Sequence, residues 1–266
     1  MAEVWWKFYD ERPFLAGGFA WTGFDYRGEP TPYGWPCINS HFGIMDMCGF
    51  PKDNFYYYQA WWGSRPVLHL FPHWNWEGKE GQEIDVWVHS NLDRVELFLN
   101  GQSQGAKDIT RNTHLMWKMK YAPGVIEARG FKDGKQVLLA TRKTSGPAAK
   151  IVLTSDRQRL QANGEDVAMI AAQILDSQGR EVPTADSSLT FKVSGGGKLI
   201  GLGNGDPSCH EMDKADSRRA FNGLCMAIIQ TAKSADEIHV EASSPGLESA
   251  TVNLTSVSVA LRPSVS

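Results

Sequence analysis

The chain carries the stretch Arg94-Val95-Glu96-Leu97-Phe98-Leu99-Asn100-Gly101, with apolar residues at every second position. Because successive side chains of a β-strand point to opposite faces, this alternation is typical of a strand with one buried face. The Asn-Gly pair that follows tolerates the positive backbone angles of a tight hairpin turn. The stretch therefore predicts an antiparallel hairpin and indicates a mainly β fold around it.

The same pattern continues on both sides of this hairpin. Apolar residues at strand spacing recur at Val67, Leu68, Leu70, Ile84, Val86, Val88, Trp117, Val125, Ile126, Val137, Leu138 and Leu139. Two further turn pairs, Pro123-Gly124 and Asp133-Gly134, separate the later runs. We therefore predict an antiparallel β-sandwich over residues 64–146.

A change of composition at Gly146-Pro147 predicts a domain boundary. Beyond it the only aromatic residues are Phe191 and Phe221, and Val, Ile, Leu and Ala fill the predicted strands. These strands cover residues 151–153, 167–174, 189–193, 226–229, 238–240 and 252–254. The glycines at 195–197 and 201–205 are interpreted as turns, because no helix pattern follows them. We expect a second sandwich over residues 147–258 and a tail at 259–266.

The first 62 residues follow a different pattern. Apolar residues recur at helical spacing over residues 4–9, and Pro13 ends that helix before the apolar run 14–21, which resembles a buried strand. A proline-rich loop follows, and Asp53 or Asn54 could cap a second helix that runs through Trp62. In α/β barrels such loops follow the carboxyl ends of strands and carry the chemistry.

Composition excludes several classes of partner. The 266 residues hold 27 basic and 30 acidic side chains, and the net charge of -3 comes without a long run of either sign. This balance argues against nucleic acid or an anionic membrane surface as a partner. No apolar stretch is long enough to span a membrane, and no signal peptide pattern opens the chain. The four cysteines form no C-x-x-C pair, so we expect buried thiols, no metal and no cofactor.

All ten tryptophans lie in the first 117 residues, and two of them belong to the aromatic loop 19–35. An aromatic ring can cover the C–H face of a sugar while nearby carboxylates and amides bind its hydroxyls. The loop offers both, with Trp21 and Trp35 beside Asp25 and Glu29. It therefore predicts a sugar site, although an aromatic core under a long loop would use the same residue types.

The residues also carry a resemblance to a known family. The run 17–36, with residues 37–43 behind it, resembles the end of the catalytic barrel in family 2 glycoside hydrolases, particularly bacterial β-galactosidases. Residues 94–105 resemble a hairpin of the sandwich that trails this barrel, and residues 201–206 resemble a loop of the terminal immunoglobulin-like domain. The resemblance implies a mainly β chain, with two immunoglobulin-like antiparallel β-sandwiches preceded by a helix-strand-loop-helix remnant of a (β/α)8 barrel over residues 1–62.

The resemblance also bears on catalysis. Retaining glycosidases use two carboxyl groups about 5 Å apart, one as acid and one as nucleophile. In this family both are glutamates of the fourth and seventh barrel strands, which we expect to lie upstream of Met1. Glu3 and Glu11 are candidates by residue type only, and a solvated helix face explains them better. We therefore assign no catalytic residue here and expect this chain alone to be inactive.

The resemblance implies roles for two residues of the loop. Trp21 matches the platform beneath the sugar in the cleaved subsite, and Asn39 matches an asparagine that hydrogen-bonds a sugar hydroxyl. Asp25 and Glu29 could hold sugar hydroxyls, or could form an ion-pair cluster with Arg27 that fixes the loop. His41 could face the pocket or be an ordinary loop residue.

Other aromatic clusters have structural explanations. Tyr33 and Trp35 suit an outer subsite or a packed turn equally well. Because consecutive helical residues point to different faces, Tyr56, Tyr57 and Tyr58, with Trp61 and Trp62, are expected to lock the second helix to its neighbours. The exposed-looking segment 73–76, His-Trp-Asn-Trp, is interpreted as part of a domain interface.

Two other functions stay open. The same fold could act on β-glucuronides or β-mannosides, and Arg27 is the one basic side chain between Trp21 and His41 that could bind a sugar acid. The chain could instead be a non-catalytic carbohydrate-binding or assembly module. Under the hypothesis of a family 2 β-galactosidase, the partner is a β-linked galactoside or oligosaccharide. Apolar surface left by an incomplete barrel predicts association, including homo-oligomers, and the family analogy implies a periplasmic or extracellular location.

Overall fold

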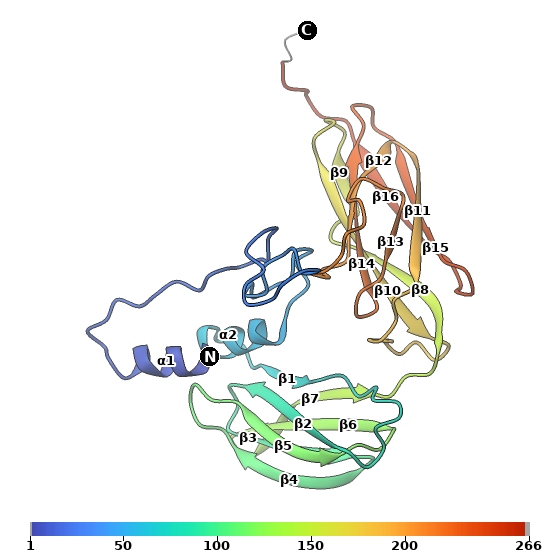
Figure 1. Ribbon diagram of the computed structural model, residues 1–266. Coiled ribbons are helices and arrows are strands. Elements are labelled where there is room, and N and C mark those ends of the chain that lie inside the picture. Colours follow the sequence, from blue (N-terminus) through green and yellow to red (C-terminus); the bar gives the residue numbers. More distant parts are fainter. Residues whose placement is uncertain (1, 264–266) are drawn as a thin grey trace. The chain divides into compact units, whose positions relative to one another are not determined.

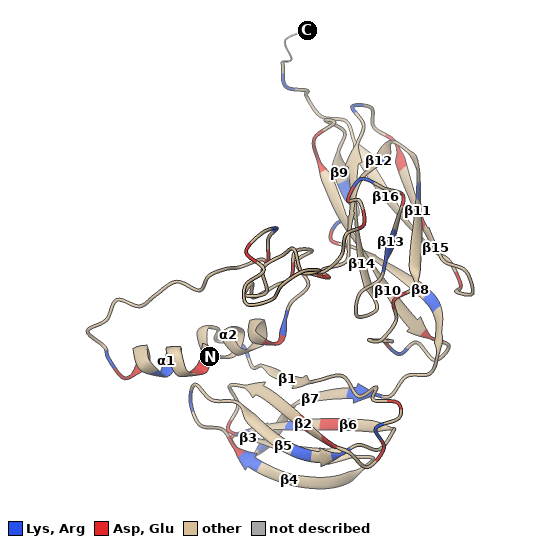
Figure 2. Cartoon of the chain, in the orientation of Figure 1, with Lys and Arg blue, Asp and Glu red and all other residues tan. Residues whose placement is uncertain are grey.

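The computed structural model describes residues 2–263, which form two compact units (Figure 1). The first unit contains the described residues up to Tyr26 together with His41–Thr144. The second contains Arg27–Ser40 and the chain from Ser145 onward. The loop Arg27–Ser40 thus folds with a domain that follows it by more than a hundred residues. Figure 2 shows that basic and acidic residues are interspersed along both units.

The first unit contains a sandwich of two antiparallel sheets, with strand orders β1-β2-β5 and β4-β3-β6-β7. Its strands are β1 Leu68–Phe71, β2 Glu83–Ser90, β3 Arg94–Leu99, β4 Gln102–Asp108, β5 Leu115–Lys120, β6 Val125–Lys132 and β7 Lys135–Lys143. One apolar cluster lies between the sheets and includes Val86 and Trp117 from the first sheet and Leu97 and Ile126 from the second.

The predicted hairpin is confirmed. Asn100 and Gly101 join β3 to β4 with φ angles of 50° and 80°. Asp133 and Gly134 make the same kind of turn between β6 and β7, with φ angles of 51° and 73°. Both pairs therefore adopt the positive angles that a two-residue hairpin requires.

Two helices, α1 Ala2–Asp10 and α2 Asp53–Trp62, cover the outer face of the β1-β2-β5 sheet (Figure 1). The ring of Tyr56 stacks on His69 of β1 at 3.7 Å, and Tyr57 donates a hydrogen bond to the backbone oxygen of Asn112 at 3.1 Å. From α1, Glu3 pairs with His114 at 2.5 Å. The prediction that aromatic residues lock the second helix to its neighbours is therefore confirmed for the contact between α2 and the sandwich.

The predicted cap of α2 is wrong. The N-cap is Lys52, which makes no side-chain capping bond, and Asp53 is the first helical residue. Its carboxylate instead lies 2.8 Å from Nε2 of His69. A sheet residue competes for this side chain, so Asp53 joins helix to sheet instead of capping its own helix.

The predicted buried strand over residues 14–21 is also wrong. These residues form no strand, and Phe14 and Phe19 are 82% and 98% exposed. A buried strand needs neighbours that accept its backbone hydrogen bonds. Within the described chain, no backbone hydrogen bond joins residues 16–21 to another segment. The observed fold is therefore mainly β with two short helices.

The second unit is a larger sandwich. Its sheets have the orders β12-β14-β10-β8 and β13-β11-β15-β16-β9, antiparallel except for the parallel pair β9 and β16. Its strands are β8 Ala148–Ser155, β9 Arg159–Gln161, β10 Val167–Asp176, β11 Ser188–Gly195, β12 Gly197–Gly203, β13 Ser217–Arg219, β14 Leu224–Thr231, β15 Glu237–Ser243 and β16 Ala250–Val257. Its buried core is mainly aliphatic, as expected, with Phe191 as its aromatic member.

The interpretation of residues 201–205 as a turn is wrong for residues 201–203. These belong to strand β12, Gly197–Gly203, which pairs with β14. A Cβ on Gly197 would lie 2.8 Å from Cγ2 of Ile238. The glycine is there because the strand packs closely on its neighbour.

The remaining features concern the ends and the cysteines. The last strand ends at Val257, and of the predicted tail 259–266 the residues 264–266 lie outside the described part. Across the described residues, neither helix has the length and apolar character needed to cross a membrane. Cys37 and Cys225 are buried and form no disulfide, as expected, whereas Cys48 and Cys209 are partly exposed.

Candidate functional site

The five predicted sugar-contacting residues divide between the two units. Trp21, Asp25 and His41 belong to the first unit, and Glu29 and Asn39 belong to the second.

Trp21 presents an exposed and oriented indole. The residue is 72% exposed, and its Nε1 donates a hydrogen bond to the hydroxyl of Tyr26 at 3.2 Å. The two rings also meet edge to face, at 6.5 Å and 85°. Tyr26 in turn contacts Phe42 at 5.7 Å. The indole is therefore fixed from one side and open to solvent, as a stacking platform requires.

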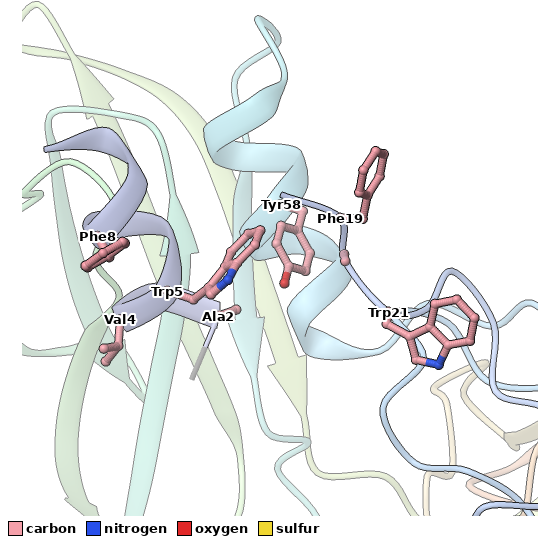
Figure 3. A pocket seen from close by; sticks show the side chains of 8 residues that line it. Ala2, Val4, Trp5, Phe8, Phe19, Trp21 and Tyr58 are labelled. Carbon is pink, nitrogen blue, oxygen red and sulfur yellow. The ribbon is translucent and has the colours of Figure 1, made fainter. Parts of the chain in front are cut away.

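Trp21 also lines a cavity of about 560 Å³ in the first unit. The walls are the side chains of Ala2, Val4, Trp5, Phe8, Phe19, Ala20, Trp21 and Tyr58. Figure 3 places Trp21 at the end of this cavity that lies away from Phe8 and Val4. The volume suits a small molecule, but the lining is nearly all apolar. A sugar would need its hydroxyl partners from elsewhere.

Asp25 is buried and holds the loop together. Its Oδ1 accepts a hydrogen bond from the backbone N–H of Gly43 at 2.7 Å, and its carboxylate forms an ion pair with Lys52. Lys52 also donates to the backbone oxygen of His41 at 3.0 Å. Asp25 and His41 are thus tied together through one lysine, and the Asp25 carboxylate fixes the loop from within.

Asp25→Asn is expected to lower the free energy of unfolding of the first unit by about 3 kcal/mol, because Lys52 would lose its buried counter-charge. The measurement is urea denaturation followed by tryptophan fluorescence. Asp108→Asn is the matched control, since the Arg94–Asp108 pair at 3.5 Å is exposed and worth less than about 1 kcal/mol. Equal effects of the two variants would contradict this role for Asp25.

Arg27 is engaged by an aspartate of the second sandwich. Its Nη2 lies 2.8 Å from both carboxylate oxygens of Asp213. Arg218 donates to the same carboxylate at 3.0 Å. Burial alone would raise the pKa of Asp213, but the hydrogen bonds from the two arginines outweigh it and hold that pKa below its usual value. Glu29 lies exposed two residues beyond Arg27, with a φ of 47°.

Asn39 is 2% exposed, and its Oδ1 has no hydrogen-bond partner within the described part of the chain. Its backbone N–H donates to the oxygen of Pro207 at 3.3 Å, and its backbone oxygen accepts from the thiol of Cys37 at 3.2 Å. An unsatisfied buried oxygen costs about 1–3 kcal/mol. The described protein thus supplies no donor for this acceptor, which lies buried in the second unit.

The remaining candidates have structural partners. Glu3 pairs with Lys7 at 2.9 Å as well as with His114, and Glu11 pairs with Arg12 at 3.5 Å on the surface. The ring of Trp35 is exposed and packs on His210 at 4.4 Å.

The interpretation of residues 73–76 as a domain interface is wrong for Trp74. This side chain is buried in the core of its own sandwich, and its Nε1 donates to the backbone oxygen of Ala122 at 2.9 Å. Trp76 is partly buried, stacks on His73 at 4.6 Å and has the ammonium of Lys79 over its ring.

Comparison with known proteins gives one family match within each sandwich. Residues 151–253 match the family described as glycoside hydrolase family 2 C-terminal domain 5, and residues 81–138 match a domain of unknown function (DUF4982). A β-galactosidase of Bacteroides ovatus is 44% identical over 252 residues, which are 94% of this chain and 29% of that protein. A putative β-glucuronidase of Formosa agariphila is 33% identical over 230 residues, which are 84% of this chain and 22% of that protein.

Solved structures give the same result. A β-glycosidase from Bacteroides vulgatus superposes with a TM-score of 0.91 at 34% identity, over 96% of this chain and 32% of that one. A family 2 member from Bacteroides cellulosilyticus superposes with a TM-score of 0.89 at 29% identity, over 96% of this chain and 38% of that chain. The chain is thus homologous to family 2 glycosidases and spans less than a third of the length of the two curated relatives.

Proposed function

Because this chain consists of C-terminal domains of a family 2 glycoside hydrolase, we propose that it forms one wall of the sugar site in a retaining β-galactosidase. The observation that carries the proposal is the exposed, oriented indole of Trp21, in a chain 44% identical to a β-galactosidase. In this role Trp21 of the first unit stacks beneath the galactosyl ring. Asn39 of the second unit is proposed separately as a residue that binds a sugar hydroxyl, on the ground of its unpaired side-chain oxygen. The two carboxyl groups that retention requires would come from the rest of the enzyme.

Residues 1–62 would be the end of the catalytic barrel. Residues 16–20 support this, because they form no turn, their backbone makes no hydrogen bond to another segment within the described chain, and Phe19 is exposed, all of which suit a strand that has neighbours on both edges. The remaining barrel would cover Phe14 and Phe19 and pair with the backbone between them. The helices α1 and α2 would then flank that strand in the chain order of a barrel.

A chimera tests this function. In the Bacteroides ovatus enzyme, the segment that matches this chain is replaced by residues 1–266. We expect the chimera to hydrolyse a chromogenic β-galactoside, whereas the 266-residue chain alone and the enzyme without that segment should not. A correctly folded chimera with no activity would overturn the proposal. Turnover by the isolated chain would overturn the assignment of both carboxyl groups to the rest of the enzyme.

A β-glucuronide is the second candidate substrate. The relatives named as β-glucuronidases favour it. The geometry weighs against it, because Arg27 already binds both oxygens of Asp213 and its charge is largely neutralised there. The same chimera assayed with a β-glucuronide decides between them. A higher kcat/KM for the glucuronide, lost in Arg27→Gln, would reverse the order of the two candidates.

Self-association of the isolated chain is a further expected result. Phe14, Phe19 and Trp21 expose large apolar areas on one short segment of the first unit. Such surface drives association when its natural cover is missing. We expect concentration-dependent oligomers in sedimentation velocity, and the double variant Phe14→Ser with Phe19→Ser should shift the protein toward monomer.

The matched control replaces Val137 and Leu139, which are also exposed and lie on β7 of the same unit. These two serine substitutions should leave the oligomer distribution unchanged. A wild-type chain that sediments as a monomer at high concentration would show that the apolar segment drives no association.

A further inference from the structure

The loop Arg27–Ser40 is held by one segment of the second sandwich, residues 207–213 between β12 and β13. In Figure 1 this blue loop meets the orange segment, and both belong to the second unit. The loop carries Asn39, one of the two residues to which the proposed function assigns the sugar. Three separate contacts make this attachment, and together we call them the loop clamp.

The first contact of the loop clamp is the ion pair of Arg27 with Asp213, in which Nη2 alone lies 2.8 Å from each carboxylate oxygen. Asp213 is itself oriented by Arg218, which is 2% exposed. The guanidinium of Arg218 also donates to the backbone oxygens of Leu202 at 2.9 Å and of Glu211 at 3.3 Å. A carboxylate oriented by a buried arginine presents one defined geometry to the loop, and the charge-assisted hydrogen bonds from Arg27 hold that end of the loop to it.

The second contact holds the returning half of the loop. The backbone oxygen of Pro207 accepts hydrogen bonds from the N–H groups of Ile38 at 2.9 Å and of Asn39 at 3.3 Å. Within the loop, the N–H of Gly28 donates to the oxygen of Ile38 at 2.8 Å, and Arg27 and Asn39 form an antiparallel bridge. Because the two ends of the loop are paired with each other, a constraint on Arg27 also constrains Asn39.

The third contact holds the tip of the loop. Nε2 of His210 lies 2.7 Å from the backbone oxygen of Pro36, and the imidazole packs on the ring of Trp35 at 4.4 Å. The clamping segment is braced at its own start, since Oδ1 of Asn204 accepts from the N–H of Asp206 and Nδ2 of Asn204 donates to the oxygen of Arg219. A braced segment can hold a loop that would otherwise be mobile.

We propose that Asp213 and His210 are positioning residues for the sugar contact of Asn39, which act by fixing the backbone that carries Asn39 within the second unit. This inference rests on the proposed function, because it assigns a purpose to the geometry of Asn39. A hydrogen-bonding side chain must be held within about 0.5 Å of its productive position, and the buried amide of Asn39 has no side-chain oxygen partner that could do so. The backbone contacts at Pro207 and the ion pair at Asp213 supply that constraint instead.

Hydrogen exchange of the 266-residue chain tests the loop clamp without any sugar. Asp213→Asn and, from the other side, Arg27→Gln are expected to raise amide exchange in residues 28–39 at least about tenfold, and to leave β10 and β14 unchanged. Asp186→Asn is the matched control, because Asp186 forms an exposed ion pair with Arg219 in the same unit. Unchanged exchange in both Asp213→Asn and Arg27→Gln would overturn the clamp.

A double-mutant cycle in the chimera tests the link to the sugar. Asn39→Ala and Asp213→Asn should each raise KM for the β-galactoside about tenfold with a smaller change in kcat. If Asp213 acts through Asn39, the double variant should be no worse than Asn39→Ala alone. Independent, additive effects would overturn the positioning role. A chimera without activity would overturn the proposed function and this role with it, while the exchange data would still decide whether the clamp exists.

Discussion

Trp21→Ala in the chimera is expected to lower kcat/KM for a β-galactoside roughly 100-fold. A ring that covers one face of a hexose removes on the order of 100 Å² of apolar surface from water, which is worth about 2.5 kcal/mol. Each 1.4 kcal/mol of lost transition-state binding costs about a factor of ten in rate. Because Trp21 is 72% exposed in this chain, its removal should cost little folding stability.

Trp21→Phe distinguishes the contribution of the aromatic ring to activity from that of the hydrogen bond to Tyr26. Phenylalanine keeps an aromatic face but cannot donate to the hydroxyl of Tyr26. We expect it to retain activity within about tenfold of the parent, with Tyr26→Phe behaving similarly. Steady-state kinetics with circular dichroism on each variant would check this. Parent-like kcat/KM in Trp21→Ala would remove Trp21 from the sugar site.

The elements that could be predicted from the sequence are those set by local pattern. The hairpin around Asn100 and Gly101 depends on alternation and on turn residues, and both act within a few positions. Strand β4, Gln102–Asp108, is predicted only through the turn that precedes it, because its own residues Gln-Ser-Gln-Gly-Ala-Lys-Asp contain no large apolar side chain. It forms at the sheet edge because β3 offers a free row of hydrogen-bonding groups.

The failure at residues 14–21 has the opposite origin. Their apolar run satisfies the local rule for a buried strand, but a strand also needs partners, and the described chain supplies none there. Sequence pattern can report what a segment would bury. It cannot report whether the partner that covers it is present.

The site shows the same division. Trp21 is predicted to bind sugar from its place in an aromatic, carboxylate-bearing loop, and this stays a prediction. Asp213 was missed because it lies 186 positions from Arg27 and nothing in its own neighbourhood distinguishes it. Asp25 carried a sugar-binding prediction on residue type, and the structure adds what residue type could not show, that its carboxylate is ion-paired to Lys52.

His89 makes the stability of the first unit depend on pH. It lies on the helix-covered face of the sheet, where its ring contacts Tyr57 at 5.5 Å and Phe71 at 4.8 Å. Burial lowers the pKa of His89 from 6.5 to about 4, and the nearby charge of His69 adds to this shift. Asp53 opposes it without cancelling it. The folded unit therefore favours the neutral imidazole.

Because the folded pKa lies below the unfolded one, the unfolded chain binds more protons than the folded chain between pH 6.5 and about 4. The contribution of His89 is thus fully present above pH 6.5 and is lost as the pH falls, by about 2 kcal/mol at pH 5. Tryptophan fluorescence during urea denaturation at pH 7.5 and pH 5 measures this loss of stability, because every tryptophan except Trp35 lies in the first unit.

His89→Phe fits the aromatic surroundings and should abolish most of the difference in unfolding free energy between the two pH values, whatever its effect on stability at either. His239→Asn, at an exposed histidine of the second unit, should leave the difference intact, and a His89→Phe variant that keeps the full pH dependence would place its origin in another group.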